Sequence, residues 1–178
     1  MLLFEPWPHM VVDNYFSDET FKNMSQEITN FSRNLKEGKT KVINPHQKRG
    51  LSFTSAALHE NHISEELLSG FPNIRKYDGP LTWLTEIAAV KGYGYQYPAH
   101  CDHSKKILSA ITYILPKSGN GTVLYNKDKV KAKTIEWQPN RTLIFAPQDG
   151  LTWHSYGNGD YQLRITLNQY LISDDVEY

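Results

Sequence analysis

Polar and apolar side chains alternate along the stretch Gln162-Leu163-Arg164-Ile165-Thr166-Leu167-Asn168. Alternation with a period of two is typical of a β-strand whose two faces meet different surroundings. On a strand at the surface, the polar face would only meet water. If the strand instead closes a jelly roll around a ligand, Arg164 and Thr166 lie inside, where a guanidinium and a hydroxyl suit a bound carboxylate. From this strand alone, both interpretations stay open.

The chain from about Leu81 onward is a series of short runs with β character. The runs are 84–91, 107–115, 121–126, 134–137, 141–146 and 161–172. Segments rich in Pro, Gly and Asn separate them, as at 116–121 and 157–159, and such residues favour turns. Short strands at this spacing predict a mainly β fold, a sandwich or jelly roll, with α-helices packed on its outside.

The first 80 residues contain supporting elements. Residues 1–14 predict an extended strand at a sheet edge, and an amphipathic helix is predicted to begin after Ser17, which suits an N-cap. Residues 36–49 are expected to form a long exposed loop, with a lid over a substrate as the alternative. A short helix is predicted at 63–68, before Gly70 and Pro72. With 178 residues, we expect one domain, in which 1–80 support a jelly-roll core at 81–178.

Composition argues against several classes of protein. The chain has 19 basic and 19 acidic residues, so it lacks the positive field that favours binding to nucleic acid or anionic lipid. Its longest apolar stretches, such as 107–115, are far shorter than the roughly 20 residues of a transmembrane helix. The N-terminus lacks the basic start of a secretory signal. Cys101 is the single cysteine, which predicts a reducing, intracellular (cytoplasmic) location and no intramolecular disulfide.

A candidate metal site begins at His100-Cys101-Asp102. On a strand, the two outer side chains would point to the same face and could bind one metal ion. His154 is a candidate third ligand, since it precedes a turn and the last strand. Two imidazoles and one carboxylate leave about half of an octahedral shell open, which is the ligand set of non-haem Fe(II) oxygenases. A His-x-Asp tripeptide alone is weak support, because it is frequent by chance.

Other residues compete less well for a catalytic role. His103 adjoins the motif, but on a strand it would point away from His100. His59 and His62 could share a helical face, but no third ligand accompanies them. No Gly-x-Ser-x-Gly motif is present, so a serine hydrolase is poorly supported.

Taken together, these residues resemble the 2-oxoglutarate-dependent oxygenase family, and within it the prolyl 4-hydroxylase-like branch. The similarity covers about residues 86–171. It rests on Gly94, His100-Cys101-Asp102, Ile111-Thr112-Tyr113-Ile114-Leu115, the turn and strand at 119–124, Pro139-Asn140-Arg141 with the strand that follows, His154 and Arg164-Ile165-Thr166. Where many relatives have a tyrosine, this chain has Lys91, and Tyr93, Tyr95 or Tyr97 is a candidate replacement.

The resemblance implies a double-stranded β-helix, a cupin-like jelly roll, and a catalytic iron held by His100, Asp102 and His154. It further implies that Arg164, with Thr166, binds the distal carboxylate of 2-oxoglutarate, and that Tyr113 hydrogen-bonds this cosubstrate. Because collagen-type prolyl hydroxylases carry Lys where this chain has Arg164, the substrate does not follow from the match.

The implied activity is that of an Fe(II)- and 2-oxoglutarate-dependent dioxygenase that consumes O2, hydroxylates a C–H bond and releases succinate and CO2, with ascorbate as a candidate reductant. Related halogenases lack the carboxylate, so Asp102 favours hydroxylation. The substrate is expected to be a peptide or protein, as for prolyl 4-hydroxylases, or a small molecule. The alternatives are a non-catalytic jelly-roll binding module and a Zn(II) hydrolase. Nucleobase dealkylation is disfavoured by the balanced charge.

Overall fold

The computed structural model describes residues 1–33, 40–47, 50–60, 65–77, 79–157, 159 and 163–173. The elements in chain order are β1 (Leu2–Leu3), β2 (His9–Val12), α1 (Asp18–Ser32), β3 (Thr40–Ile43), η1 (Pro45–Gln47), α2 (Ser52–Glu60), η2 (Glu65–Gly70), β4 (Thr82–Lys91), β5 (Gln96–His100), β6 (Lys106–Leu115), β7 (Thr122–Tyr125), β8 (Lys131–Ile135), β9 (Thr142–Phe145), β10 (His154–Gly157) and β11 (Leu163–Ile172). The η elements are 3-10 helices. Among the described residues, no helix has the length and apolar character needed to cross a bilayer.

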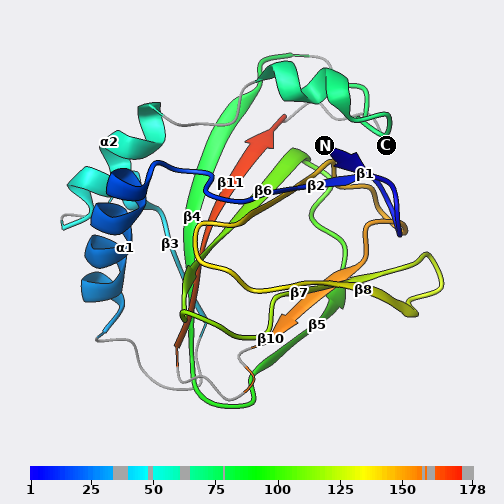
Figure 1. Ribbon diagram of the computed structural model, residues 1–178. Helices are drawn as coiled ribbons and strands as arrows, with labels where there is room; N and C mark the ends of the chain where they lie inside the picture. The colour runs from blue at the N-terminus through cyan, green and yellow to red at the C-terminus, as the bar shows by residue number, and fades with distance from the viewer. Residues whose placement is uncertain are drawn as a thin grey trace.

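The strands form two antiparallel sheets. The larger sheet has the order β1-β2-β9-β6-β11-β4-β3, and the smaller has the order β5-β10-β7-β8. In Figure 1 the smaller sheet lies on one side of the larger, and α1 and α2 lie on the other side. This arrangement confirms the predicted fold class: a mainly β jelly roll with flanking α-helices.

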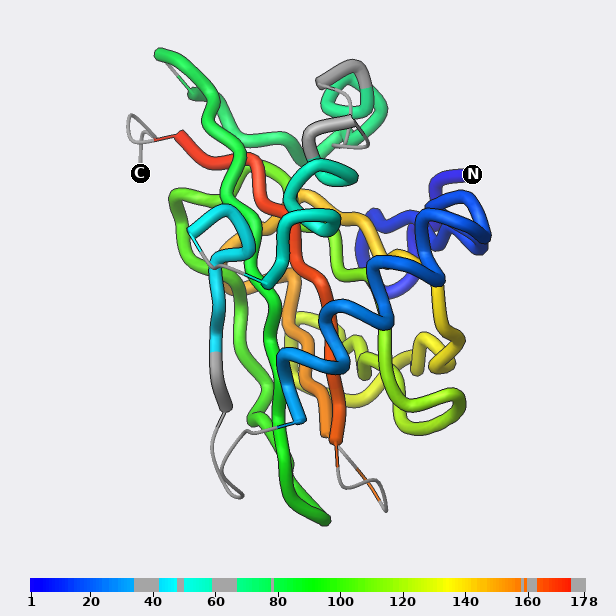
Figure 2. The backbone as a smooth tube through the Cα atoms, turned by 90° about the vertical axis from the view of Figure 1, so that its left-hand side faces the viewer, coloured from blue at the N-terminus to red at the C-terminus, as the bar shows by residue number. Residues whose placement is uncertain are grey.

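Helix α1 begins and packs as its sequence predicts. The side chain of Ser17 accepts a hydrogen bond from the backbone N–H of Thr20 at 3.2 Å, which caps the first turn. Met24 and Ile28 are fully buried in a core cluster that includes Ile165 of β11. Figure 2 shows α1 and the α2 region lying across the strands of the larger sheet. The strand predicted at 1–14 is also present, divided into β1 and β2, with β1 at the sheet edge.

Strand β11 is buried on both of its faces. Ile165 and Leu167 are fully buried in the core cluster beneath the helices. On the opposite face, Arg164, Thr166 and Asn168 are only 3%, 2% and 8% exposed. The polar face of the alternating stretch therefore lies inside the molecule, as expected for a strand that closes a jelly roll around a ligand.

A second apolar cluster holds the two sheets together. It contains Trp7, Tyr113, Leu124, Ile135, Trp137, Leu143 and Phe145. The rings of Tyr113 and Trp137 are stacked, with centroids 4.4 Å apart and planes 9° from parallel. Phe145 packs edge-on against His154 at 5.2 Å, so this cluster directly supports a residue of the candidate site.

The prediction of a continuous loop at 36–49 is wrong. Thr40–Ile43 form β3, which pairs with β4 at the edge of the larger sheet, and Pro45–Gln47 form η1. Three of the four β3 residues, Thr40, Val42 and Ile43, are β-branched and favour a strand, and pairing with β4 supplies the hydrogen-bonded partner. Residues 36–39 and 48–49 lie outside the described residues, as does the lid hypothesis for them.

Other element boundaries also differ from the sequence prediction. The helix expected at 63–68 is the 3-10 helix η2 at Glu65–Gly70, and residues 61–64 lie outside the described part. The strand expected at 134–137 is β8, Lys131–Ile135. Helix α2 was not predicted. Its N-terminus is capped from another element, since Glu27 of α1 accepts hydrogen bonds from the backbone N–H groups of Phe53 and Thr54.

Candidate functional site

Two histidines of the candidate metal site end up side by side on neighbouring strands. His100 is the last residue of β5, His154 is the first residue of β10, and the two are direct partners in the antiparallel register. Their ring centroids are 4.3 Å apart. Residues far apart in the sequence thus meet because β5 and β10 pair.

Both imidazoles are oriented by the same kind of contact, a hydrogen bond to the backbone carbonyl two residues earlier in the chain. The Nδ1–H of His100 donates to the carbonyl oxygen of Pro98, and that of His154 donates to the carbonyl oxygen of Thr152, each at 3.0 Å. A carbonyl oxygen can only accept, so the proton is on Nδ1 and the lone pair is on Nε2. This arrangement is common for histidines that bind metal ions.

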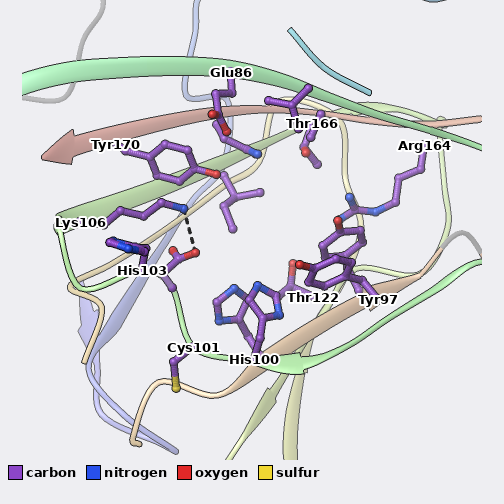
Figure 3. Close-up of a pocket in the computed structure, with 17 residues that line it drawn as sticks. Glu86, Tyr97, His100, Cys101, His103, Lys106, Thr122, Arg164, Thr166 and Tyr170 are labelled. Atoms are coloured by element: carbon purple, nitrogen blue, oxygen red, sulfur yellow. Dashed lines mark hydrogen bonds and ion pairs between the residues drawn. The ribbon is translucent and has the colours of Figure 1, made fainter. Parts of the chain in front are cut away.

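Asp102 completes the group, but not from within the strand. Strand β5 ends at His100, so the expectation that His100 and Asp102 share one face of a strand is wrong. Their ligand atoms and that of His154 nevertheless lie within 4.8 Å of one another. The thiol of Cys101 points away from His100, as Figure 3 shows. We call His100, Asp102 and His154 the His-Asp-His cluster.

The Asp102 carboxylate is held by two neighbours. Its Oδ2 accepts a hydrogen bond from Ser109 Oγ at 2.6 Å, and its Oδ1 forms an ion pair with Lys106 Nζ at 2.9 Å. Burial opposes ionisation of Asp102, but Lys106, His154 and Ser109 outweigh it and lower its pKa. The carboxylate is therefore ionised and fixed in position.

His154 is neutral at physiological pH. Burial lowers its pKa to about 4, although Asp102 acts in the opposite direction. The cluster thus offers two imidazoles, of which His154 is neutral, and one carboxylate. These donors fit a divalent metal ion such as Fe(II), and Fe(II) bound to them would keep sites open for other ligands.

Arg164 is a buried cation for which the described residues provide no anion. It is 3% exposed, its Nε has no hydrogen-bond partner, and no ion pair to it is found among the described residues. Its guanidinium lies 4.4 Å from the centroid of the Tyr156 ring and 5.0 Å from that of Trp137. Burial lowers its pKa to about 10, which leaves it charged. A buried charge of this kind is costly unless a ligand pairs with it.

The His-Asp-His cluster and Arg164 line one pocket of about 350 Å³. Thr166 also lines it, on the same face of β11 as Arg164. In Figure 3, Arg164 extends into the pocket from the side opposite Tyr170, with His100 below. A molecule with a carboxylate at one end could pair with Arg164 and reach the cluster with its other end.

Tyr113 lies behind the pocket wall. Its hydroxyl donates to Thr122 Oγ1 at 2.8 Å and accepts from the backbone N–H of Thr122 at 3.2 Å, and the side chain is fully buried. Thr122, not Tyr113, lines the pocket. A direct contact of Tyr113 with a cosubstrate stays a prediction.

The other histidines considered are not in the cluster. His103 is exposed, and its Nδ1 accepts a hydrogen bond from the backbone of Lys105. The side chain of His59 and the whole of His62 lie outside the described residues. Lys91, at the position of the family tyrosine, does not line the pocket, whereas Tyr97 does and stacks on Tyr156 at 5.0 Å.

Several residues that line the pocket were not predicted from the sequence. They are Glu86, Lys106, Thr122, Tyr156, Asn168 and Tyr170. A signal was present for two of them: Asn168 is on the polar face of the stretch that contains Arg164, and Glu86 is a charged residue directly before the apolar run 87–90 of β4. The position of Lys106 in the pocket could not be predicted from the sequence, because its ion pair with Asp102 depends on the fold.

Three solved structures that share this fold are prolyl hydroxylases. One is a prolyl hydroxylase from Trichoplax adhaerens, in complex with a peptide fragment of the hypoxia inducible factor oxygen degradation domain, with a TM-score of 0.65 at 18% identity over 92% of this chain and 83% of that chain. A Pseudomonas putida prolyl-4-hydroxylase has a TM-score of 0.63 at 14% identity, covering 92% and 91%. A viral collagen prolyl hydroxylase from Paramecium bursaria Chlorella virus-1, in its 2OG complex, has a TM-score of 0.58 at 12% identity, covering 93% and 95%.

No protein-family model matches the sequence, and a comparison with curated protein sequences finds no match. At these low identities, the structural likeness establishes the fold. The chain shares the fold of these three prolyl hydroxylase structures.

Proposed function

We propose that the protein is an Fe(II)- and 2-oxoglutarate-dependent dioxygenase that hydroxylates a C–H bond of its substrate. The observation that carries the proposal is the position of Arg164, a buried cation without an anion, in the same pocket as the His-Asp-His cluster. A dicarboxylate that binds both would supply the missing anion. The shared fold supports the same assignment.

Each residue has a proposed role. His100, Asp102 and His154 would hold Fe(II), and the Nδ1 hydrogen bonds and the Ser109 contact would keep their ligand atoms oriented. Arg164 would bind the distal carboxylate of 2-oxoglutarate, and Thr166 would donate its hydroxyl to the same group. Bound iron supplies the redox chemistry that couples decarboxylation of 2-oxoglutarate to substrate oxidation by O2.

The surrounding chain would limit side reactions. Tyr156 and Trp137 lie against the guanidinium of Arg164, and Thr122 closes the wall beside them. These side chains keep water from the charged end of the cosubstrate, which strengthens its pairing with Arg164. We propose that residues 1–178 act as one domain, with β2 and β3 of the N-terminal part completing the larger sheet.

The neighbours suggest candidate substrates. The Trichoplax enzyme was solved with a peptide, so a prolyl residue of a peptide is one candidate for this chain. A small molecule is the other, because fold likeness does not transfer substrate identity.

The decisive experiment measures succinate from purified protein supplied with Fe(II), ascorbate and 2-oxoglutarate, with and without O2. We expect O2-dependent succinate formation that a substrate stimulates. A hydrolase with a bound Zn(II) would be indifferent to O2. A non-catalytic binding module would form no succinate with any compound in a broad panel, and either result would overturn the proposal.

A further inference from the structure

The pocket extends beyond the His-Asp-His cluster to a region that the proposed cosubstrate does not use. Asn168 and Tyr170 follow Arg164 on the same face of β11, and at about 3.3 Å per residue Asn168 lies about 13 Å from Arg164 along the strand. Figure 3 shows Glu86 and Tyr170 reaching into the pocket on the side away from Arg164. We call Glu86, Asn168 and Tyr170 the distal region.

Glu86 brings a carboxylate to the distal region. It is half-buried on β4, directly opposite Asn168 in the antiparallel register. Residues opposed in this way have Cβ atoms about 4.5–5.5 Å apart. Among the described residues, no cation forms an ion pair with Glu86. Burial raises the pKa of Glu86, and nearby Asp102 also raises it while Lys106 lowers it, so a new cation beside it would favour its ionised form.

Asn168 brings a second oxygen acceptor. Its side chain is 8% exposed, and its Oδ1 has no hydrogen-bond partner. Its amide also contacts the hydroxyl of Tyr170 through a side-chain hydrogen bond. Buried acceptors are normally paired, so the distal region lacks a donor that a ligand would bring.

Among the described residues, no charge of the pocket forms an ion pair with Glu86, and Lys106, which favours its ionised form, is itself paired with Asp102. Lys106 Nζ is 2.9 Å from Asp102 Oδ1 and 3.5 Å from the centroid of the Tyr170 ring, so Asp102 already compensates its charge. Arg164 lies on the far side of the pocket. The group that best satisfies Glu86 and Asn168 together is therefore a cation that carries N–H donors.

We infer that the substrate presents a protonated amine to Glu86 and Asn168, which would place a neighbouring C–H bond at the His-Asp-His cluster. This inference rests on the proposed function and names its substrate class. The ring nitrogen of a peptidyl proline has neither a charge nor an N–H, so it would leave both acceptors without a donor. A compact free amine, such as a free amino acid, satisfies both.

Binding to protein loaded with redox-inert Mn(II) tests this inference without turnover. L-Proline and L-lysine are titrated by calorimetry, in parallel with N-acetylproline and Nα,Nε-diacetyl-lysine, in the presence of 2-oxoglutarate. We expect at least one free amine to bind, and its acetylated counterpart to bind at least about tenfold more weakly, because a buried acceptor is then left unpaired. Equal binding of the acetylated compounds, or no binding of either free amine, would overturn the inference.

Glu86→Gln keeps the shape of the side chain and removes its charge. We expect it to weaken binding of the free amine by at least about tenfold. Glu136→Gln is the matched control, since Glu136 is exposed and does not line the pocket. Unchanged amine binding in a folded Glu86→Gln variant would reject the role of Glu86. Titration of 2-oxoglutarate alone is a separate measurement. If 2-oxoglutarate does not bind, that result counts against the proposed function. The comparison of free and acetylated amines would still test the inference about Glu86 and Asn168.

Discussion

The buried charge of Arg164 indicates that the pocket binds an anionic ligand. This charge is buried between Tyr156 and Trp137, and no described residue pairs with it. Two opposite consequences follow from the same observation. Removing the charge should weaken binding of the dicarboxylate, and it should also relieve the ligand-free protein of an uncompensated buried cation.

We predict both effects for Arg164→Met, which replaces the guanidinium by an apolar chain. The dissociation constant for 2-oxoglutarate should rise by about a hundredfold, the size expected when one partner of a buried charge pair is lost. The unfolding free energy of the ligand-free protein should rise by about 1 kcal/mol or more. Calorimetry and chemical denaturation measure the two quantities, with Arg33→Ala, at the exposed end of α1, as the control. A variant that binds 2-oxoglutarate as tightly as the wild type would remove Arg164 from the site.

The assignment of the His-Asp-His cluster as a metal site can be tested by mutation, and the neighbouring His103 provides a control. His100→Ala or Asp102→Ala should abolish Fe(II)-dependent succinate formation and lower Fe(II) affinity, because a donor atom is lost. His103→Ala removes an adjacent imidazole that is not in the cluster, so metal affinity should be retained. Metal binding by equilibrium dialysis and the rate of succinate formation check this. Wild-type affinity in either cluster variant would refute the metal assignment.

We predict that His9 makes the stability of the fold sensitive to acid. It is fully buried, donates its Nδ1–H to the Trp7 carbonyl at 2.8 Å, and burial lowers its pKa below the ordinary value of 6.5. Below that value the unfolded chain takes up a proton that folded His9 resists, so stability should fall as pH decreases through 6.5. Chemical denaturation at a series of pH values measures the slope, which should be smaller in His9→Asn than in the wild type. Equal slopes in the wild type and His9→Asn would show that His9 is not responsible.

At the scale of the element, strands with a strong local sequence pattern were predictable. Strands that form only because they pair with distant segments were not. The alternation in β11 and the apolar run of β6 are encoded locally, and both strands form where the sequence places them. β5 and β10 are short, and β5 contains Pro98. Their strand conformation depends on pairing within the smaller sheet, where β10 lies between β5 and β7, and no local pattern reveals this non-local interaction. His100 and His154 could therefore be predicted as metal ligands from the sequence, but the pairing of β5 with β10 that brings them together could not.

Helix α2 shows the same limit for helices. Its sequence begins with Ser52, Phe53 and Thr54, which are modest helix formers. The helix begins there because Glu27 of α1 caps it through two backbone N–H groups and the Thr54 hydroxyl. A cap supplied by a residue so distant in the sequence becomes apparent only once both helices pack on the sheet.

The β7–β8 pair makes a prediction about Gly121. A Cβ at Gly121 would overlap the backbone carbonyl of Ile135 in β8, so Gly121→Ala should force the two strands apart. We expect a loss of about 1–3 kcal/mol in unfolding free energy. Gly70→Ala is the matched control, because nothing lies within 4 Å of the added methyl group there. Thermal unfolding of both variants measures the difference, and equal Tm values would contradict the predicted overlap.

At the scale of the whole molecule, the site joins the two sheets. His100 and His154 lie on β5 and β10 of the smaller sheet, whereas Arg164 and Thr166 lie on β11 of the larger one. Asp102 follows β5 and is held by Lys106 and Ser109 of β6, so it already links the two. A metal ion with a dicarboxylate would add a second link through Arg164.

Ligands that bridge the sheets should stabilise the entire fold. At a free concentration about 100 times its dissociation constant, a ligand that binds only the folded state adds about 2.7 kcal/mol. For a chain of this size, that corresponds to a rise in Tm of about 5–10 °C. We therefore expect 2-oxoglutarate to raise the Tm of the Mn(II)-loaded protein by about this amount, and to have little effect in Asp102→Ala, where the metal that anchors it is lost. Differential scanning calorimetry measures both, and an equal rise in Asp102→Ala would mean that the cosubstrate binds without the metal and does not bridge the sheets.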